Sequence, residues 1–123
     1  MTPHPIIVNV LDATDLVLIP VGPSALDLWS SKQVLALLEK RHHKNRRMDA
    51  KVLICRKIPG TRVGREAREA VDIFGLDIVP VEICQRIAYV DAMAEGLSVQ
   101  QYAPASLAAA EVNALCDFII KQS

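Results

Sequence analysis

The most regular pattern of apolar residues in the chain lies in residues 15–21, where five apolar residues are interrupted only by Pro20. No polar residue alternates with them, which indicates a strand with both faces covered, as in a parallel sheet packed between helices. Residues 52–55 and 77–83 repeat the pattern, the latter around Pro80. Because proline lacks the N–H that a ladder needs, we expect the third strand to lie near an edge or to bulge at this residue.

Apolar residues recur at helical spacing in the segments between and after these strands. We predict helices over residues 5–13, 25–40, 62–74 and 87–95, and a short additional strand at residues 97–99. Pro104 is expected to open a last helix, whose buried stripe is formed by Leu107, Val112, Leu115, Phe118 and Ile119. This alternation predicts an α/β fold in three layers, with three or four mostly parallel strands flanked by helices. Ligands of such sheets bind beyond the carboxyl ends of the strands.

The composition fits a single domain that spans residues 1–123. Half of the residues are apolar (51%) but only 4% are aromatic, so the core is expected to be aliphatic. No apolar run approaches the roughly 20 residues of a membrane span, and the first residues do not resemble a signal peptide, so no membrane partner is expected. Three widely separated cysteines, Cys55, Cys84 and Cys116, predict buried thiols in a reducing cytoplasm rather than disulfides or a metal site.

The net charge of zero conceals two regions of opposite charge. Residues 40–68 contain eleven basic and two acidic residues, a net charge of +9, and the rest of the chain carries −9. A basic segment of this kind indicates a surface that faces a polyanion. Its first part is the run of residues 40–47, which includes Arg46 and Arg47. Such runs are more often solvated helix ends than nucleic-acid sites, so both interpretations stay open.

Five ordered segments resemble the middle and the carboxyl-terminal part of ParA-type partition ATPases of the MinD/ParA superfamily. They are residues 15–27 (Asp-Leu-Val-Leu-Ile-Pro-Val through Pro-Ser-Ala-Leu-Asp), 54–57 (Ile-Cys-Arg-Lys), 61–70, 85–99 (an Arg-x-x-Tyr…Gly-x-x-Val element) and 102–104. The resemblance covers nearly the whole chain. It implies a partial P-loop NTPase-like sheet of the ParA type and a role in plasmid partition and DNA segregation.

The family's phosphate-binding loop has no counterpart in this sequence. In the family, a deviant Walker A loop wraps the phosphates with glycine N–H groups, balances their charge with lysine and holds magnesium with a threonine hydroxyl. The five glycines form no such cluster followed by Lys-Ser/Thr, and Met1 stands where the family has the aspartate of its Walker B Asp-Thr-Pro. The chain therefore resembles the carboxyl-terminal half of a ParA. We predict no catalytic residues, no cofactor bound by the chain alone and no independent ATP hydrolysis, although the family uses ATP and magnesium.

The resemblance also implies a set of DNA-binding arginines. Family members bind DNA non-specifically through basic residues of their carboxyl half, which correspond here to Arg62, Arg65, Arg68 and Arg86. Together with Arg46 and Arg47 they form the predicted DNA-binding set. Arginine contacts to phosphates release counterions and do not depend on the base sequence. We therefore expect weak binding with a steep dependence on salt.

Two further sites concern nucleotide and subunit contacts. Cys55 and Arg56 lie at a strand end near where the family places adenine, although the cysteine departs from the family's Thr or Asn. Asp27 lies near the family's subunit-facing helix start, but a favourable charge at a helix N-terminus explains it better. The family's phosphate-loop strand, which would pair with the first strand, is absent. We therefore expect Leu16 and Leu18 to lie on an open edge that a second copy, a partner chain or the N-terminal segment covers.

The preferred hypothesis is a ParA-like DNA partition protein that acts without catalysis, in the cytoplasm and on the nucleoid. Its expected partners are non-specific DNA and either further copies of itself or a full-length ParA-type subunit. The family resemblance also implies a ParB-type centromere-binding protein as a partner. Three alternatives stay open: a regulator that pairs with a full-length ParA, a fragment of an ATPase that needs its missing N-terminal half, and a structural α/β domain without a DNA role.

Overall fold

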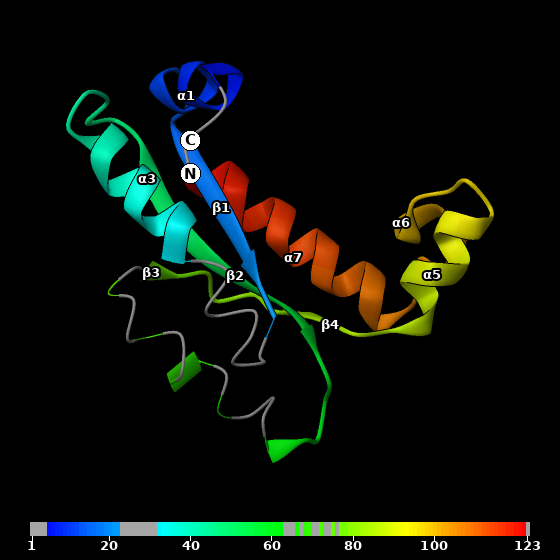
Figure 1. The fold of residues 1–123 in the computed structure, drawn as a ribbon. Helices are drawn as coiled ribbons and strands as arrows, with labels where there is room; N and C mark the ends of the chain where they lie inside the picture. Colours follow the sequence, from blue (N-terminus) through cyan, green and yellow to red (C-terminus); the bar gives the residue numbers. More distant parts are fainter. Residues whose placement is uncertain are drawn as a thin grey trace.

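The computed structural model describes residues 5–22, 32–62 and 77–122, together with residues 66, 68, 69, 72 and 75. Its sheet contains β1 (Leu16–Val21), β2 (Asp49–Lys57), β3 (Asp77–Ile78) and β4 (Ile83–Cys84). β2 pairs in parallel with each of the other three strands, and β1 lies along one edge (Figure 1). The expected α/β class with a mostly parallel sheet is therefore confirmed.

The third strand differs from the prediction because it is interrupted. β3 pairs with the first half of β2, whereas β4 pairs with its last residues. Pro80 lies exposed between β3 and β4 and has no N–H for the ladder, so the continuous strand predicted for residues 77–83 is wrong. The pairing of β2 with β4 also shifts register between Cys55 and Lys57, which marks a bulge at the end of β2.

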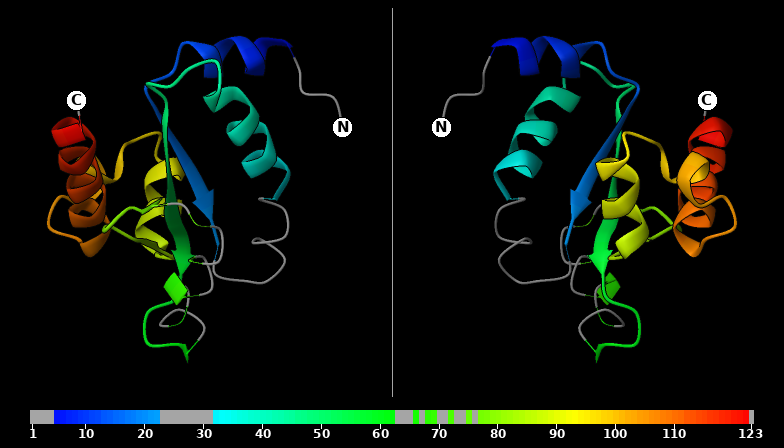
Figure 2. Two further views of the ribbon diagram at one scale, coloured as in Figure 1. Left: turned by 90° about the vertical axis from the view of Figure 1, so that its left-hand side faces the viewer. Right: turned by 90° about the vertical axis from the view of Figure 1, so that its right-hand side faces the viewer.

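Helices lie on both sides of the sheet. They are α1 (Pro5–Asp12), α3 (Lys32–His42), α5 (Ile87–Ala94), α6 (Val99–Tyr102) and α7 (Leu107–Gln122). α1 and α3 occupy one side of the strands and α7 the other, which gives the expected three layers, while α5 and α6 lie beyond the end of β4 (Figures 1 and 2). The helices predicted over residues 5–13 and 87–95 are confirmed, as is the described part of the one over residues 25–40. Across the described ranges, no helix is long and apolar enough to cross a membrane.

The strand predicted at residues 97–99 is wrong, because Ser98 begins a helix. The Ser98 hydroxyl accepts the N–H of Gln101 at 3.2 Å, and the Gln101 side chain accepts the N–H of Ser98 at 3.1 Å. This reciprocal arrangement is a capping box, which satisfies two amide groups that the first turn of α6 would otherwise leave unpaired.

α7 begins at Leu107, not at Pro104 as predicted. Ser106 accepts the N–H of Ala109 at 3.1 Å and thereby caps the helix. The buried stripe also differs, because Leu107 is 66% exposed whereas Ala108 and Ala109 are fully buried in a cluster with α5 and α6. The small side chains of Ala108 and Ala109 allow these helices to approach closely, and Leu107, the first residue of α7, faces solvent. The other members of the predicted stripe are half-buried: Val112, Leu115, Phe118 and Ile119.

Two aliphatic clusters form the core. The larger lies between the sheet and the helices α1 and α3, and its buried residues are Leu11, Ile19, Val21, Leu38, Met48, Val52 and Ile54. The smaller joins α5, α6 and α7 through Ala92, Val99, Ala108 and Ala109. The three C-terminal helices therefore share a core of their own, which adjoins the sheet where α7 contacts β4.

Candidate nucleic-acid interface

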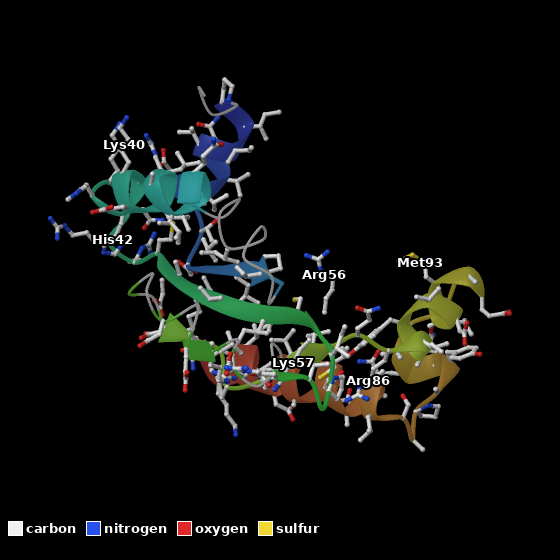
Figure 3. All side chains as sticks on the ribbon, turned by 60° about the horizontal axis from the view of Figure 1, so that its bottom comes forward. Lys40, His42, Arg56, Lys57, Arg86 and Met93 are labelled. Atoms are coloured by element: carbon white, nitrogen blue, oxygen red, sulfur yellow. The ribbon has the colours of Figure 1, made fainter. Side chains whose placement is uncertain are left out.

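Two groups of basic side chains lie at opposite ends of β2. The first, named here the helix-end cluster, lies in the last turn of α3 and in the turn that follows it, and consists of Lys40, Arg41, Lys44, Arg46 and Arg47. The second, the strand-end cluster, lies where β2 and β4 end and consists of Arg56, Lys57, Arg68 and Arg86. Figure 3 shows Lys40 well separated from Lys57 and Arg86. Apart from Arg86, the two groups belong to one basic segment of the sequence, residues 40–68, and they lie apart in the structure.

A buried asparagine fixes the turn of the helix-end cluster. Asn45 is 8% exposed, and its side-chain amide donates to the carbonyl oxygens of Leu11 at 3.0 Å and Thr14 at 2.9 Å. These two bonds tie the turn after α3 to the end of α1. Arg46 and Arg47, which follow directly, are exposed. The cluster therefore presents its arginines from a fixed backbone.

Most cations of the helix-end cluster have no carboxylate partner. Arg41 is the exception, because its guanidinium donates to both carboxylate oxygens of Asp12, with Nε at 3.0 Å from Oδ1. This contact holds the pKa of Asp12 below its ordinary value. In the part of the chain that the structure describes, no carboxylate lies within ion-pair distance of Lys40, Lys44, Arg46 or Arg47. Their charges add to one another and can attract a polyanion.

A carboxylate from the segment between β3 and β4 binds two members of the strand-end cluster. Glu82, whose side chain is 19% exposed, accepts from Lys57 Nζ at 2.7 Å and from Arg68 Nε at 2.9 Å. Arg68 also donates to the carbonyl oxygen of Val79 at 2.8 Å. A phosphate that binds Arg68 would therefore have to compete with Glu82 and a backbone carbonyl.

Arg86 is bound in the same way by Glu111. Its Nε lies 3.2 Å from Oε1 and its terminal nitrogen 3.1 Å from Oε2, a two-point contact. The same carboxylate accepts the N–H of Cys84 at 3.3 Å and the hydroxyl of Tyr89 at 2.9 Å. One side chain of α7 thus holds the end of β4 and the start of α5. Glu111 is not among the residues predicted from the sequence, and its signal there is that it is the one charged residue in residues 104–116.

These contacts shift the pKa values of the groups around Glu111. Burial acts to raise the pKa of Glu111, but the hydrogen bonds from Arg86, Cys84 and Tyr89 prevail and hold it below the ordinary value. Burial, and then the contact with Glu111, raises the pKa of Tyr89 and that of Cys84. At neutral pH the site is therefore one carboxylate, one guanidinium and two uncharged donors. Such an arrangement stabilises the fold rather than transferring protons.

Arg56 occupies the bulge at the end of β2 with a left-handed backbone, at a φ of +56°. For a residue with a side chain this conformation costs on the order of 1–3 kcal/mol. Figure 3 shows Arg56 and Lys57 leaving β2 on opposite sides. Burial raises the pKa of the neighbouring Cys55, and Arg56 opposes this only in part, so the Cys55 thiol is uncharged at neutral pH. Cys55 and Cys84 are half-buried and Cys116 is exposed, so the expectation that the three cysteines are buried is wrong.

The remaining predicted DNA-binding and interface residues lie apart from both clusters or outside the described ranges. Arg62 is exposed and pairs with Glu66 at 3.1 Å across one helical turn, a contact that contributes little in water. Arg65 and Asp27 lie outside the described residues, so their predicted roles stay predictions.

β1 carries the two predicted interface residues of the sheet edge. Leu16 and Leu18 are half-buried, and β1 pairs with β2 along one side. Within the described segments no strand pairs with the other side of β1, and α1 contacts α3 instead of adding a strand. An open edge is therefore present in this part of the chain, and its cover by a partner stays a prediction.

A cavity of about 630 Å³ lies between α3 and the amino-terminal ends of β2 and β3. Its wall combines Leu35, Leu38 and Met48 with His42, whose Nδ1 lies 3.1 Å from the carbonyl oxygen of Met48. Ligands of parallel sheets bind at the opposite, carboxyl edge. We therefore assign no ligand to this cavity.

Comparison with known proteins relates the chain to a curated protein. No family model matches the chain. The chain is 30% identical to "Maintenance of carboxysome distribution protein A" of Halothiobacillus neapolitanus over 107 residues, which are 86% of this chain and 50% of the relative. This similarity supports a ParA-like relationship. Because the chain spans about half the length of this curated relative, the activity and partners of the whole relative enter below only as proposals.

Proposed function

We propose that this chain is a ParA-like positioning protein that binds DNA without sequence preference through the helix-end cluster. The observation that carries the proposal is that four cations of this cluster have no carboxylate partner in the described part of the chain: Lys40, Lys44, Arg46 and Arg47. The ParA-like relationship supports a positioning role, and the curated relative is named for maintaining the distribution of carboxysomes. In this role the chain would act in the cytoplasm, bound to the nucleoid.

Binding of this kind is electrostatic. Four cations at the end of α3 and in the turn after it can neutralise up to four phosphates and release the counterions condensed on them. The logarithm of the binding constant falls by about 0.9 per phosphate contact for each tenfold rise in salt. Four contacts should therefore weaken binding roughly 100-fold between about 50 and 200 mM salt.

Fluorescence anisotropy with a random-sequence duplex at these two salt concentrations tests the proposal. The double variant R46A/R47A should lower the salt slope by about two and the affinity at low salt by about 100-fold. Lys121→Ala, an exposed cation on α7 outside the cluster, is the control and should bind as the wild type does. Binding that is absent at low salt, or equal at both concentrations, would refute a DNA role and favour the structural α/β domain.

We further propose that the chain alone does not hydrolyse ATP. ATP and magnesium are implied by the family, but the described residues at the strand ends do not fit them. The carboxylates Glu82 and Glu111, which could hold a metal ion, are already bound by basic side chains. The sequence has no glycine cluster followed by Lys-Ser/Thr. An ATPase assay on purified protein tests this, and turnover that follows the protein peak through every purification step would refute it.

The open side of β1 favours a second function, pairing with a full-length ParA-type subunit. An unpaired row of N–H and C=O groups is a template for a strand from another chain. Co-purification with a tagged full-length ParA-type protein from the same cells tests this function. Failure of the two proteins to co-purify at both low and high salt would refute this pairing function. A ParB-type centromere-binding partner rests on the family resemblance alone.

A further inference from the structure

Asp12 is the one carboxylate that pairs with the helix-end cluster in the described part of the chain. It is the last residue of α1, and both of its oxygens accept from the Arg41 guanidinium, with Nε 3.0 Å from Oδ1. The charge of Lys44 also acts on this carboxylate. The same anion is therefore bound by one cation of the cluster and attracted by a second.

The contact between Asp12 and Arg41 has the geometry in which a guanidinium also binds a phosphate group, with two donors on two oxygens. Arg41 lies in the last turn of α3 next to Lys40, and Lys44 lies in the turn that follows. A DNA phosphate in the place of the carboxylate would therefore bind Arg41 beside cations that already face solvent. Asp12 occupies this place with an anion of the chain itself.

The stability of α1 does not account for an aspartate at this position. The C-terminal end of a helix has a partial negative charge, so a carboxylate on its last residue is unfavourable there. The end of α1 is held independently by Asn45, whose amide donates to the carbonyl oxygens of Leu11 and Thr14. Replacement of Asp12 by asparagine, which helix C-termini accept, should therefore leave α1 in place.

Asp12 is held less firmly than the carboxylates of the strand-end cluster. Its side chain is 36% exposed and binds Arg41 alone, whereas the side chains of Glu82 and Glu111 are 19% and 14% exposed and each binds more than one residue. A pair that solvent reaches contributes little to stability and is weakened by salt. The Asp12 contact can therefore be lost without loss of the fold.

We propose that Arg41 is a fifth DNA-binding cation of the helix-end cluster and that Asp12 withholds it from DNA. The inference rests on the DNA binding proposed above. In the wild type four cations contact phosphates while Arg41 stays on Asp12, whose charge also repels a phosphate that approaches the guanidinium. The contact is autoinhibitory, because removal of the carboxylate both frees a cation and removes a repulsion.

A general effect of net charge is the alternative explanation for any gain in affinity. Asp15 provides the control, since it is exposed near the same end of α1 and makes no ion pair among the described residues. Asp15→Asn removes the same charge as Asp12→Asn but frees no guanidinium. The two variants therefore separate release of Arg41 from a change in net charge.

Fluorescence anisotropy with a random-sequence duplex at about 50 and 200 mM salt tests the proposal. Asp12→Asn should raise the affinity at low salt roughly tenfold and steepen the salt slope by about 0.9, the effect of one added phosphate contact. Asp15→Asn should raise the affinity by less than about threefold, because salt screens a charge that is not in contact. The double variant Asp12→Asn/Arg41→Gln should bind as the wild type does, since the freed guanidinium is gone and the net charge is restored.

Three results would overturn the inference and leave the proposed DNA binding intact. They are a wild-type affinity for Asp12→Asn, an equal gain for Asp15→Asn, and a double variant that keeps the gain. Absence of binding by both the wild type and Asp12→Asn at low salt would instead refute DNA binding, and this inference with it. Circular dichroism checks the fold of each variant. If Asp12→Asn loses helix, Asp12→Ser takes its place with the same expected gain.

Discussion

The helix-end cluster and the strand-end cluster contain the same types of side chain in opposite surroundings. At the strand end, Glu82 and Glu111 bind Lys57, Arg68 and Arg86 in half-buried ion pairs. At the helix end, Asp12 binds Arg41 alone and the other cations face solvent. The difference comes from carboxylates that distant parts of the chain supply. The paired basic residues at the strand end stabilise the fold, and the solvent-facing ones at the helix end are available to a polyanion.

The largest effect should follow from removing the carboxylate between α7 and the strand end. Glu111→Ala leaves Arg86 half-buried without its partner and removes the acceptor of the Cys84 N–H. The Tyr89 hydroxyl keeps only the carbonyl oxygen of Ala108 at 3.2 Å. We expect the free energy of unfolding to fall by about 2–4 kcal/mol, measured by urea denaturation. Glu66→Ala, which breaks the exposed pair with Arg62, is the control and should cost less than about 0.5 kcal/mol. If both variants lost the same free energy of unfolding, the half-buried ion pair at the strand end would stabilise the fold no more than an exposed pair does.

A smaller effect should appear when the same carboxylate is protonated. The folded-state pKa of Glu111 lies below its ordinary value of 4.5, so its contribution to stability is complete above that value and is lost as the pH falls through the folded pKa. The stability of the wild type should therefore decline on acidification below about pH 4.5 more steeply than that of Glu111→Gln, which has no carboxylate. Urea denaturation at a series of pH values measures both slopes. Parallel curves would show that other carboxylates cause the acid lability.

The smallest effect should be that of the strand-end arginines on DNA affinity. Arg68→Gln and Arg86→Gln each remove a guanidinium that already donates to a carboxylate, although Arg68 shares Glu82 with Lys57. Affinity at low salt should therefore change by less than about twofold. By comparison, loss of one solvent-facing cation that contacts a phosphate should lower DNA affinity roughly tenfold at low salt. A tenfold loss in either variant would place DNA at the strand end and remove the distinction between the two clusters.

Much of the fold could be predicted because its signals are local. β1 follows from an apolar run that only Pro20 interrupts, and the centre of β2 follows from the apolar run of residues 52–55. α1 and α5 follow from helical periodicity. α6 has a local signal as well, since Ser98 and Gln101 have the spacing of a capping box, and this outweighs the apolar residues beside it. The phase of α7 could not be predicted, because it depends on how closely Ala108 and Ala109 approach the neighbouring helices.

Less of the candidate site could be predicted, because its partners are far apart in sequence. Glu111 lies 25 residues from Arg86, and Glu82 lies 25 residues from Lys57. No periodicity or spacing relates such pairs, which meet only because α7 and the segment before β4 pack beside the end of β2. A single charged residue among residues 104–116 indicates that Glu111 has a partner but does not identify it. The basic run that contains Arg46 and Arg47, by contrast, is exposed as a local reading predicts, while its DNA-binding role stays a prediction.

The backbone at Arg56 restricts which residues this position can hold. A φ of +56° is the mirror image of the ordinary helical value, and a D-amino acid would adopt it without strain. A branched β-carbon of the natural hand would collide with the neighbouring carbonyl oxygen, which disfavours Val, Ile and Thr, whereas Gly or Asn would relieve the collision. The central strand thus ends in a joint whose handedness is opposite to that of the residues around it, at the point where its pairing with β4 shifts register.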